Sequence, residues 1–352
     1  MNEPKKPLIR KRYIIVLALV LLLNLIKLPY YYSQPGIAQE LNGMITVEGT
    51  NGVEEGAFML TTVEMARATP LYYVWSLLSS YRHILPEEQV RSSDETDSDY
   101  HERQRLLMSG SQENAKIAAY EQADAEVTYE YRGVLVTNLI EGMSAAKELK
   151  TGDLITEVNG TPTHTAEELL TLLEGYSKDD VVTLSVTRDG EPQTVELAFQ
   201  SFPDEYEVEE GRVGLGILSP VTDRDVTFSP SVTINETDIG GPSAGLMYSL
   251  EIYNQLVDED ITHGYLVAGT GTINDQGIVG PIGGASQKVV AADKAGAQYF
   301  FAPDASGQNE TNYEEAKHAA EDIGTDMQVI PVQTIEDALR FLEELPDNKE
   351  GK

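Results

Sequence analysis

The chain of 352 residues contains no cysteine, which excludes disulfide bonds, a thiolate nucleophile and cysteine-ligated metals. Basic residues are few, because 25 Lys and Arg stand against 58 Asp and Glu, giving a net charge of −33. Without a basic surplus to replace phosphate counterions, we do not expect nucleic acid as a partner. The five histidines are scattered and none belongs to an HExxH motif. We therefore expect neither a histidine-built metal site nor a cofactor.

The N-terminus has the features of a membrane anchor. Five basic residues between positions 5 and 12 precede an apolar run, Tyr13 to Leu28, and the tyrosines 30–32 follow it. The 20 residues from 13 to 32 would span about 30 Å as a helix, which matches the hydrocarbon core. The tyrosines would form an interfacial belt, and the positive tail would stay in the cytoplasm. A cleaved signal peptide is the alternative, although no convincing small-x-small cleavage site follows the run.

We therefore assign residues 1–35 to a cytoplasmic tail and a single-pass anchor in the cell membrane, with everything after Leu28 outside the cell. Beyond it, strand-like pieces at 44–47 and 58–63 alternate with glycine-rich turns. An aromatic stretch holds the single tryptophan, Trp75, which we interpret as a packing residue. The acidic composition of residues 87–104 predicts a solvated loop, and residues 106–125 read as a helix.

From residue 130 the pattern becomes sharper. A strand at 133–136 precedes a short helix that begins at Ser144. A helix is expected over 164–176, with Thr165 as its N-cap and Glu168 three residues later. Alternating residues on either side of Asp189-Gly190 predict a hairpin of two strands, Val181 to Thr187 and Thr194 to Phe199.

This order of elements resembles a PDZ domain, above all in the turn-strand-turn motif from Gly152 to Gly160. The resemblance is good over 130–200 and weak over 40–80, so we assign residues 36–205 to a PDZ-like region. It implies that an extended peptide adds as a strand beside the helix 164–176. The carboxylate-binding loop would be either Gly56-Ala57-Phe58-Met59 or Tyr131-Arg132-Gly133-Val134. A small α+β spacer without a ligand is the alternative.

A candidate nucleophile, Ser243, lies in the turn Gly240-Gly241-Pro242-Ser243-Ala244-Gly245, which leads into an apolar helical pattern. The serine would sit near a helix N-terminus, where unpaired backbone N–H groups can hold a developing oxyanion. A turn that simply caps a helix is the alternative. A serine hydroxyl needs a base, and Lys288 heads a helix of small and apolar residues between glycine-rich turns. Desolvation there would lower the lysine pKa and leave a neutral amine to act as the base.

These two segments together resemble the proteolytic domain of Lon proteases. The sequence around Ser243 matches the nucleophile motif of that family, and Lys288 follows 45 residues later with Pro281 to Gly284 before it. The resemblance covers 207–345, and we assign residues 206–346 to this domain. It implies a Ser-Lys dyad, with Thr270 as the threonine that hydrogen-bonds the lysine. One departure is Gly240, since many Lon enzymes have an acidic residue at that position.

The whole chain resembles the membrane-anchored Lon-like PDZ proteases of Gram-positive bacteria. The expected fold is α+β: a transmembrane helix, a PDZ-like domain and a Lon-type proteolytic α/β domain. The chain has no GxxxxGK[ST] motif, so no ATP is expected. The resemblance implies an ATP-independent serine endopeptidase that cleaves extracellular peptides or unfolded proteins, and Lon domains tend to form homo-oligomeric rings. A non-catalytic PDZ scaffold and an α/β-hydrolase triad of Ser243, Asp304 and His318 are the alternatives.

Overall fold

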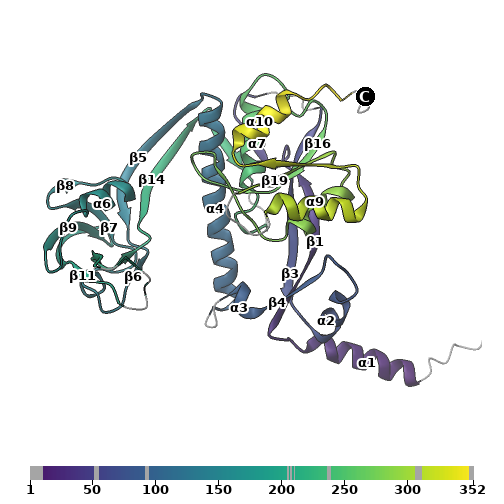
Figure 1. Cartoon of the computed structure of the whole chain (residues 1–352), viewed down its shortest axis with the longest axis horizontal. Helices are drawn as coiled ribbons and strands as arrows, with labels where there is room; N and C mark the ends of the chain where they lie inside the picture. Colours follow the sequence, from purple (N-terminus) through teal and green to yellow (C-terminus); the bar gives the residue numbers. More distant parts are fainter. Residues whose placement is uncertain are drawn as a thin grey trace, which may run out of the picture. The chain divides into compact units, whose positions relative to one another are not determined.

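The chain divides into two compact units in a nested order (Figure 1). The computed structural model describes residues 11–50, 55–91, 95–203, 206, 208–209, 211–235, 239–305 and 311–348. Unit 1 combines Met1–Glu126 with Phe228–Lys352, and unit 2 is Val127–Thr227. Unit 2 is therefore an insertion into a unit built from both ends of the chain.

A six-stranded sheet forms the centre of unit 1, in the order β20-β19-β16-β3-β1-β4. Strand β3 pairs antiparallel with β1 and parallel with β16, and β16 and β20 pair parallel with β19. The helices of unit 1 are α1 (Lys11–Leu25), α2 (Pro70–Ser76), α3 (Glu87–Val90), α4 (Asp97–Gln122), α7 (Gly245–Leu256), α8 (Ala285–Lys294), α9 (Asn312–Ile323) and α10 (Ile335–Glu343). Its strands are β1 (Tyr30–Glu40), β2 (Ile45–Val47), β3 (Ala57–Arg67), β4 (His83–Pro86), β15 (Val232–Ile234), β16 (Leu266–Gly269), β17 (Thr272–Ile273), β18 (Val279–Gly280), β19 (Tyr299–Pro303) and β20 (Gln328–Val332).

The core of unit 1 draws on distant parts of the sequence. Phe58 and Leu60 of β3 are fully buried, and so is Phe300 of β19. The structure places residues 36–126, which we assigned to the PDZ-like region, in unit 1, where they supply three strands of the six-stranded sheet and the long helix α4. The expected strand at 58–63 is part of β3, which pairs with the nearby β1 on one side and with β16, about 200 residues later in the chain, on the other.

Helix α4 begins nine residues earlier than the composition predicts. Thr96 accepts a hydrogen bond from the backbone of Asp99, and the Asp99 carboxylate accepts one from the Thr96 N–H, which makes a capping box. Acidic side chains are favourable in a first turn because they face unpaired N–H groups and the positive end of the helix dipole. The expected solvated loop over 87–104 is therefore wrong over α3 (Glu87–Val90) and from Asp97 onward.

The N-terminal apolar run forms α1, a helix of 15 residues that is about 22 Å long. None of the described helices combines the length and the apolar character needed to cross a membrane. Tyr31 and Tyr32, which we expected in an interfacial belt, are only 7% and 6% exposed. They belong to β1, where they pair with β3 and β4, so the belt is wrong.

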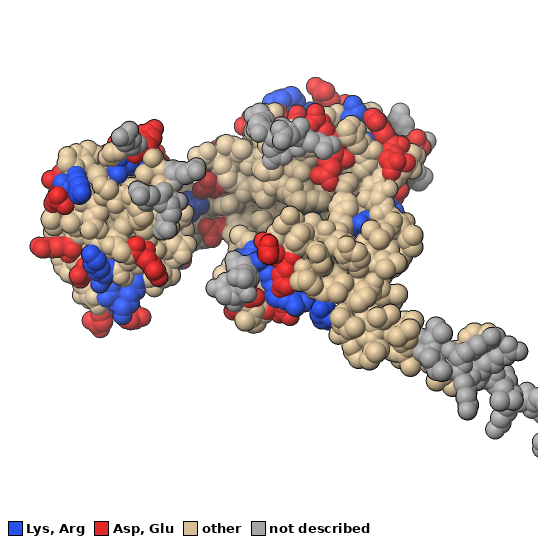
Figure 2. Space-filling view, turned by 60° about the horizontal axis from the view of Figure 1, so that its bottom comes forward, with Lys and Arg blue, Asp and Glu red and all other residues tan. Residues whose placement is uncertain are grey.

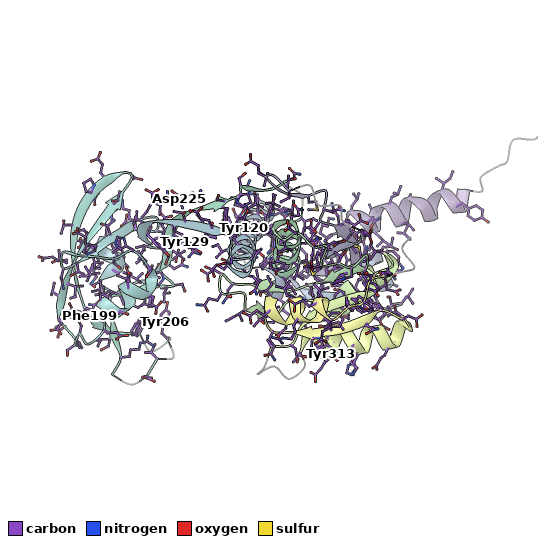
Figure 3. The ribbon with its side chains drawn as sticks, turned by 90° about the horizontal axis from the view of Figure 1, so that it is seen from above. Tyr120, Tyr129, Phe199, Tyr206, Asp225 and Tyr313 are labelled. Atoms are coloured by element: carbon purple, nitrogen blue, oxygen red, sulfur yellow. The ribbon has the colours of Figure 1, made fainter. Side chains whose placement is uncertain are left out.

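Unit 2 is built around a second sheet, in the order β10-β9-β7-β5-β14. Its core contains Val134, Ile155, Leu169 and Leu184, all nearly inaccessible to solvent. Figure 3 shows Tyr129 and Asp225 on the two neighbouring strands through which the chain enters and leaves this unit. The elements are β5 (Glu126–Leu135), β6 (Asn138–Leu139), α5 (Ala145–Glu148), β7 (Leu154–Val158), β8 (Thr161–Pro162), α6 (Ala166–Leu172), β9 (Val181–Arg188), β10 (Glu191–Ala198), β11 (Gln200–Ser201), β12 (Val213–Gly214), β13 (Ile217–Leu218) and β14 (Val221–Ser229).

Local predictions within unit 2 are confirmed. Strands β9 and β10 form the expected hairpin, with Asp189 and Gly190 both at positive φ in its turn. Thr165 and Glu168 form the expected capping box of α6, although the helix ends at Leu172 instead of residue 176.

Candidate active site

Ser243 lies two residues before α7, in a loop held on two sides by hydrogen bonds. The backbone N–H of Gly271 donates to the Ser243 carbonyl (2.9 Å), and the N–H of Leu246 donates to the Gly271 carbonyl (3.1 Å). Gly241 adopts φ +92, a left-handed conformation that favours glycine and lets the chain turn sharply before the serine. The nucleophile loop, residues 240–243, is thereby fixed against the segment that follows β16.

Lys288 is on the first turn of α8 and is only 3% exposed. Its Nζ lies 2.9 Å from Ser243 Oγ and donates to the carbonyl of Thr61 at 2.6 Å. Burial lowers the pKa of Lys288 to about 7. The two neighbours are neutral oxygens, so no carboxylate offsets the lost hydration and the neutral amine becomes accessible near neutral pH.

Thr270 is fully buried, but its contact differs from the one that the resemblance implied. Its hydroxyl donates to the carbonyl of Ser243 at 3.0 Å and does not reach Lys288. The partner of the lysine on that side is the Thr61 carbonyl in β3. Thr61 was missed because its strand was assigned to the other domain, and a backbone carbonyl leaves no signal in a sequence.

Helix α4 forms one side of the site around Ser243, which we did not predict from the sequence. The carbonyl of Gln104 accepts a hydrogen bond from the Gly241 N–H (3.0 Å), and the buried Ser111 hydroxyl donates to the Pro242 carbonyl (2.9 Å). A side chain at position 240 would bring its Cβ to 3.0 Å from the Gln104 Cβ. The close approach of α4 therefore leaves little room for a side chain at position 240.

Two depressions flank Ser243 within unit 1. The larger one, about 560 Å³, runs between β3 and α4 and reaches Lys288. Its walls include Thr62, Met65, Tyr100 and Met108. The smaller one, about 390 Å³, lies on the side of Thr272 and Pro281 to Gly283. A chain lying across Ser243 would thus have room on both sides of the reacting carbon.

His318, the base in the hydrolase alternative, is exposed on α9, whereas Ser243 Oγ is bonded to Lys288. No cluster of three or more potential metal ligands occurs among the described residues. The arrangement around Ser243 can therefore supply a nucleophile and a base without a histidine.

In unit 2, neither candidate for the carboxylate-binding loop fits. Residues 56–59 lie in unit 1, at the start of buried strand β3, and residues 131–134 lie inside β5. Strand β14 is instead an edge strand of the unit 2 sheet, and the Ala166 N–H at the start of α6 donates to the Thr222 hydroxyl (2.9 Å). The edge of β14 thus lies beside the helix that we expected to line the peptide site.

Comparisons with known proteins agree with these two parts. Residues 232–343 match the model of the Lon protease (S16) C-terminal proteolytic domain, and residues 113–199 match that of the PDZ domain. The chain therefore contains a Lon-type proteolytic domain, which implies a serine peptidase, together with a PDZ domain.

Similar proteins each cover only a part of the chain. The Lon protease of Campylobacter concisus is 36% identical over 101 residues, which are 28% of this chain and 12% of that protein. A probable periplasmic serine endoprotease DegP-like of Bartonella henselae is 28% identical over 82 residues, 23% of this chain and 16% of that protein. The PDZ domain of an SdrC-like protein from Listeria monocytogenes is 24% identical with a TM-score of 0.23, covering 25% of this chain and 88% of that one. The chain thus spans less than a fifth of the length of these curated relatives.

Proposed function

We propose that this protein is an ATP-independent serine endopeptidase with a Ser243-Lys288 dyad. The observation that carries the proposal is the 2.9 Å separation of Lys288 Nζ and Ser243 Oγ, with the amine buried and bonded otherwise only to a carbonyl. A neutral amine at this distance can accept the hydroxyl proton as the oxygen attacks.

The reaction follows from these positions. Ser243 Oγ attacks the peptide carbonyl while Lys288 takes its proton, and the resulting ammonium protonates the leaving amine. Water then attacks the acyl-serine, with Lys288 again accepting a proton, and the acid and free serine are released. The backbone N–H groups of Ser243 and Ala244 have no hydrogen-bond partner among the described residues, which favours them as donors to the oxyanion.

An extended peptide is the substrate that this site supports best. Strand β16 pairs with β3 only over Ala57 to Leu60, and no described strand continues along that edge. Residues Thr61 to Met65 of β3 line the larger depression, so their backbone groups can pair with a peptide as an added strand. Because the chain has no ATPase motif, its substrates would be short or already unfolded.

We propose that unit 2 captures peptide C-termini along the edge of β14. The carbonyls of Leu215 and Gly216 point inward, accepting from the N–H groups of Ala145 and Ile140. The N–H groups of Gly216 and Ile217 therefore point outward beside this edge, where they can bind a carboxylate. A peptide held in this way raises the local concentration of its scissile bond near Ser243.

We further propose that the N-terminal segment anchors the protein in the cell membrane with its catalytic part outside. The support is the apolar run Tyr13 to Leu28 behind a cluster of five basic residues.

A fluorophosphonate probe tests the catalytic proposal, because it labels only an activated serine. We expect labelling and peptide cleavage by the wild type, unchanged by added or depleted ATP, and neither by Ser243→Ala. The matched control is Ser249→Ala, since that serine is buried in α7 and bonds only to its own helix, at the Leu246 carbonyl. An unlabelled, inactive wild type would favour the non-catalytic scaffold.

A further inference from the structure

A group of large apolar side chains on unit 1 is left uncovered beside α1. Helix α2 and the turn after it expose Val74 by 61%, Leu77 by 72% and Leu78 by 77%. Soluble surfaces carry single apolar residues, but a contiguous group of this size marks an interaction site. The α2 patch consists of Leu71, Val74, Trp75, Leu77 and Leu78.

Hydrogen bonds on either side of α2 connect the α2 patch to the C-terminal end of α1. The Thr69 hydroxyl, which caps α2, also donates to the Asn24 side-chain carbonyl of α1 (3.0 Å), and the Leu28 N–H donates to the Ala68 carbonyl (2.9 Å). The other face of α2 packs inward, where Tyr72 stacks on Tyr32 with ring centroids 4.4 Å apart. Figure 1 shows α1 and α2 side by side at the same end of the β1–β3 hairpin.

The charge distribution around the α2 patch is unlike that of the rest of the chain. The protein has 58 acidic residues in 352, yet none occurs in 65–86 or in 4–39. The charges closest to it along the chain are cations: Lys27 follows α1, and the Arg82 guanidinium lies 4.0 Å from the centre of the Trp75 ring. Acidic residues of other segments come near but are paired, since Glu87 forms ion pairs with Arg67 and Arg91, and Asp322 accepts a hydrogen bond from the Tyr81 hydroxyl (2.5 Å). In Figure 2, the surface from which α1 emerges is tan, without red acidic side chains.

We propose that the α2 patch inserts into the interface of a lipid bilayer that contains anionic lipids. Trp, Tyr and Leu beside Lys and Arg, with no acidic residue in the same segments, form a composition that favours binding to an anionic membrane surface. The patch is continuous with α1, which exposes Leu21, Leu22 and Leu25. Only residues 26–29 separate α1 from β1, so unit 1 would rest directly on the lipid. This inference rests on the proposed anchoring of the N-terminal segment.

The single tryptophan of the chain makes the inference directly measurable, because Trp75 belongs to the patch. The full-length protein is reconstituted into vesicles of phosphatidylcholine and phosphatidylglycerol, with and without brominated phosphatidylcholine. We expect bromine to remove about half or more of the Trp75 emission, since an interfacial indole lies near the acyl chains. We also expect the lipid to protect Trp75 from aqueous iodide.

The double substitution Leu77→Ser and Leu78→Ser should restore most of the emission lost to bromine while peptide cleavage continues. Leu106→Ser, at a leucine of α4 that is 62% exposed, is the matched control and should leave the quenching unchanged. Protein that floats with vesicles but keeps its emission and its access to iodide would overturn the inference and leave the anchoring intact. Protein that does not float would overturn both. Protection of Trp75 without lipid, rising with protein concentration, would identify a second copy as the occupant and also overturn it.

Discussion

At the scale of single residues, the site depends on where one amine is buried. Lys288 reaches Ser243 Oγ and the Thr61 carbonyl and is almost inaccessible to water. A carboxylate at the same distance would hold the proton on the amine, whereas neutral oxygens leave desolvation unopposed. Thr270 also adds no charge, because its hydroxyl donates to the Ser243 carbonyl and so holds the backbone of that residue.

The first prediction concerns the base. Lys288→Arg keeps a positive charge but supplies no neutral amine, because a guanidinium stays protonated. We expect peptide cleavage to fall to the level of Ser243→Ala, with the far-ultraviolet circular dichroism spectrum unchanged. Substantial turnover by a well-folded Lys288→Arg protein would remove Lys288 from the role of base.

The second prediction concerns stability and pH. The pKa of Lys288 falls from 10.5 to about 7 on folding, so between these values the unfolded chain binds a proton that the folded chain does not. The free energy of unfolding therefore rises with pH across this window and loses this contribution as pH falls to 7. Lys288→Met removes the titrating group. Between pH 7 and pH 10 the free energy of unfolding of the wild type should rise by about 4 kcal/mol more than that of Lys288→Met, at about 1.36 kcal/mol per pH unit.

Denaturant unfolding of both proteins across this range measures the difference, and other titrating groups cancel because both proteins share them. A constant difference would mean that Lys288 keeps an ordinary pKa in the folded state. The lost bonds to Ser243 and Thr61 also destabilise Lys288→Met, but that effect does not depend on pH.

At the scale of elements, α4 makes several of the hydrogen bonds that hold the loop around Ser243 in place. Its Gln104 carbonyl and Ser111 hydroxyl bond to the backbone of Gly241 and Pro242. Further along the helix, Asn114 donates to the Ile273 carbonyl (3.2 Å), and the Tyr120 hydroxyl, labelled in Figure 3, donates to the Pro230 carbonyl (2.6 Å). One helix thus holds the loop of the nucleophile and the segments on either side of it.

The third prediction tests whether these hydrogen bonds from α4 matter for activity. Ser111→Ala removes the donor to the Pro242 carbonyl and should lower kcat by roughly two- to tenfold, with KM for a short peptide little changed, since one hydrogen bond contributes about 1 kcal/mol. Steady-state kinetics measure the split. Ser249→Ala, equally buried but bonded to its own helix, should lower kcat less. Equal losses in both variants would show a general effect of lost packing.

The elements that could be predicted from the sequence are those specified by neighbours along the chain. The β9–β10 hairpin is encoded by alternation around Asp189-Gly190, and α6 by its capping box. The pairing of β3 with β16 has no such local signal, because parallel strands far apart in sequence recognise each other only in the folded core. The Thr61 carbonyl and α4 also lie far from Ser243 in the sequence, so the sequence did not predict them as parts of the site. Ser243 and Lys288 were predicted because each lies in a motif.

At the scale of the whole molecule, unit 2 enters and leaves unit 1 through neighbouring strands. Strands β5 and β14 pair within one sheet, and the chain crosses between units at Glu126 and at Phe228. Each unit keeps its own core, with Val134 and Ile155 in one and Phe300 and Ala268 in the other. Removal of residues 127–227 therefore takes away a complete folded unit, whereas removal of 130–200 would leave β14 without its partner.

The fourth prediction follows from this architecture. Replacing residues 127–227 with a short glycine linker should leave the Ser243-Lys288 pair assembled, because all of its hydrogen-bond partners lie in unit 1. Cleavage of a short unspecific peptide should continue at nearly the wild-type rate. Cleavage of a native substrate should show a raised KM with less change in kcat, as expected when uniform binding is lost.

Two other outcomes would each reject the capture role of unit 2. Higher activity on both substrates would mean that unit 2 restrains the site, because its removal would then give every peptide better access to Ser243. Equal loss on both would mean that it supports the fold, and a lower unfolding midpoint should accompany that loss. Only a selective loss separates recognition from chemistry, since the short peptide reports on the dyad alone and the native substrate reports on both units.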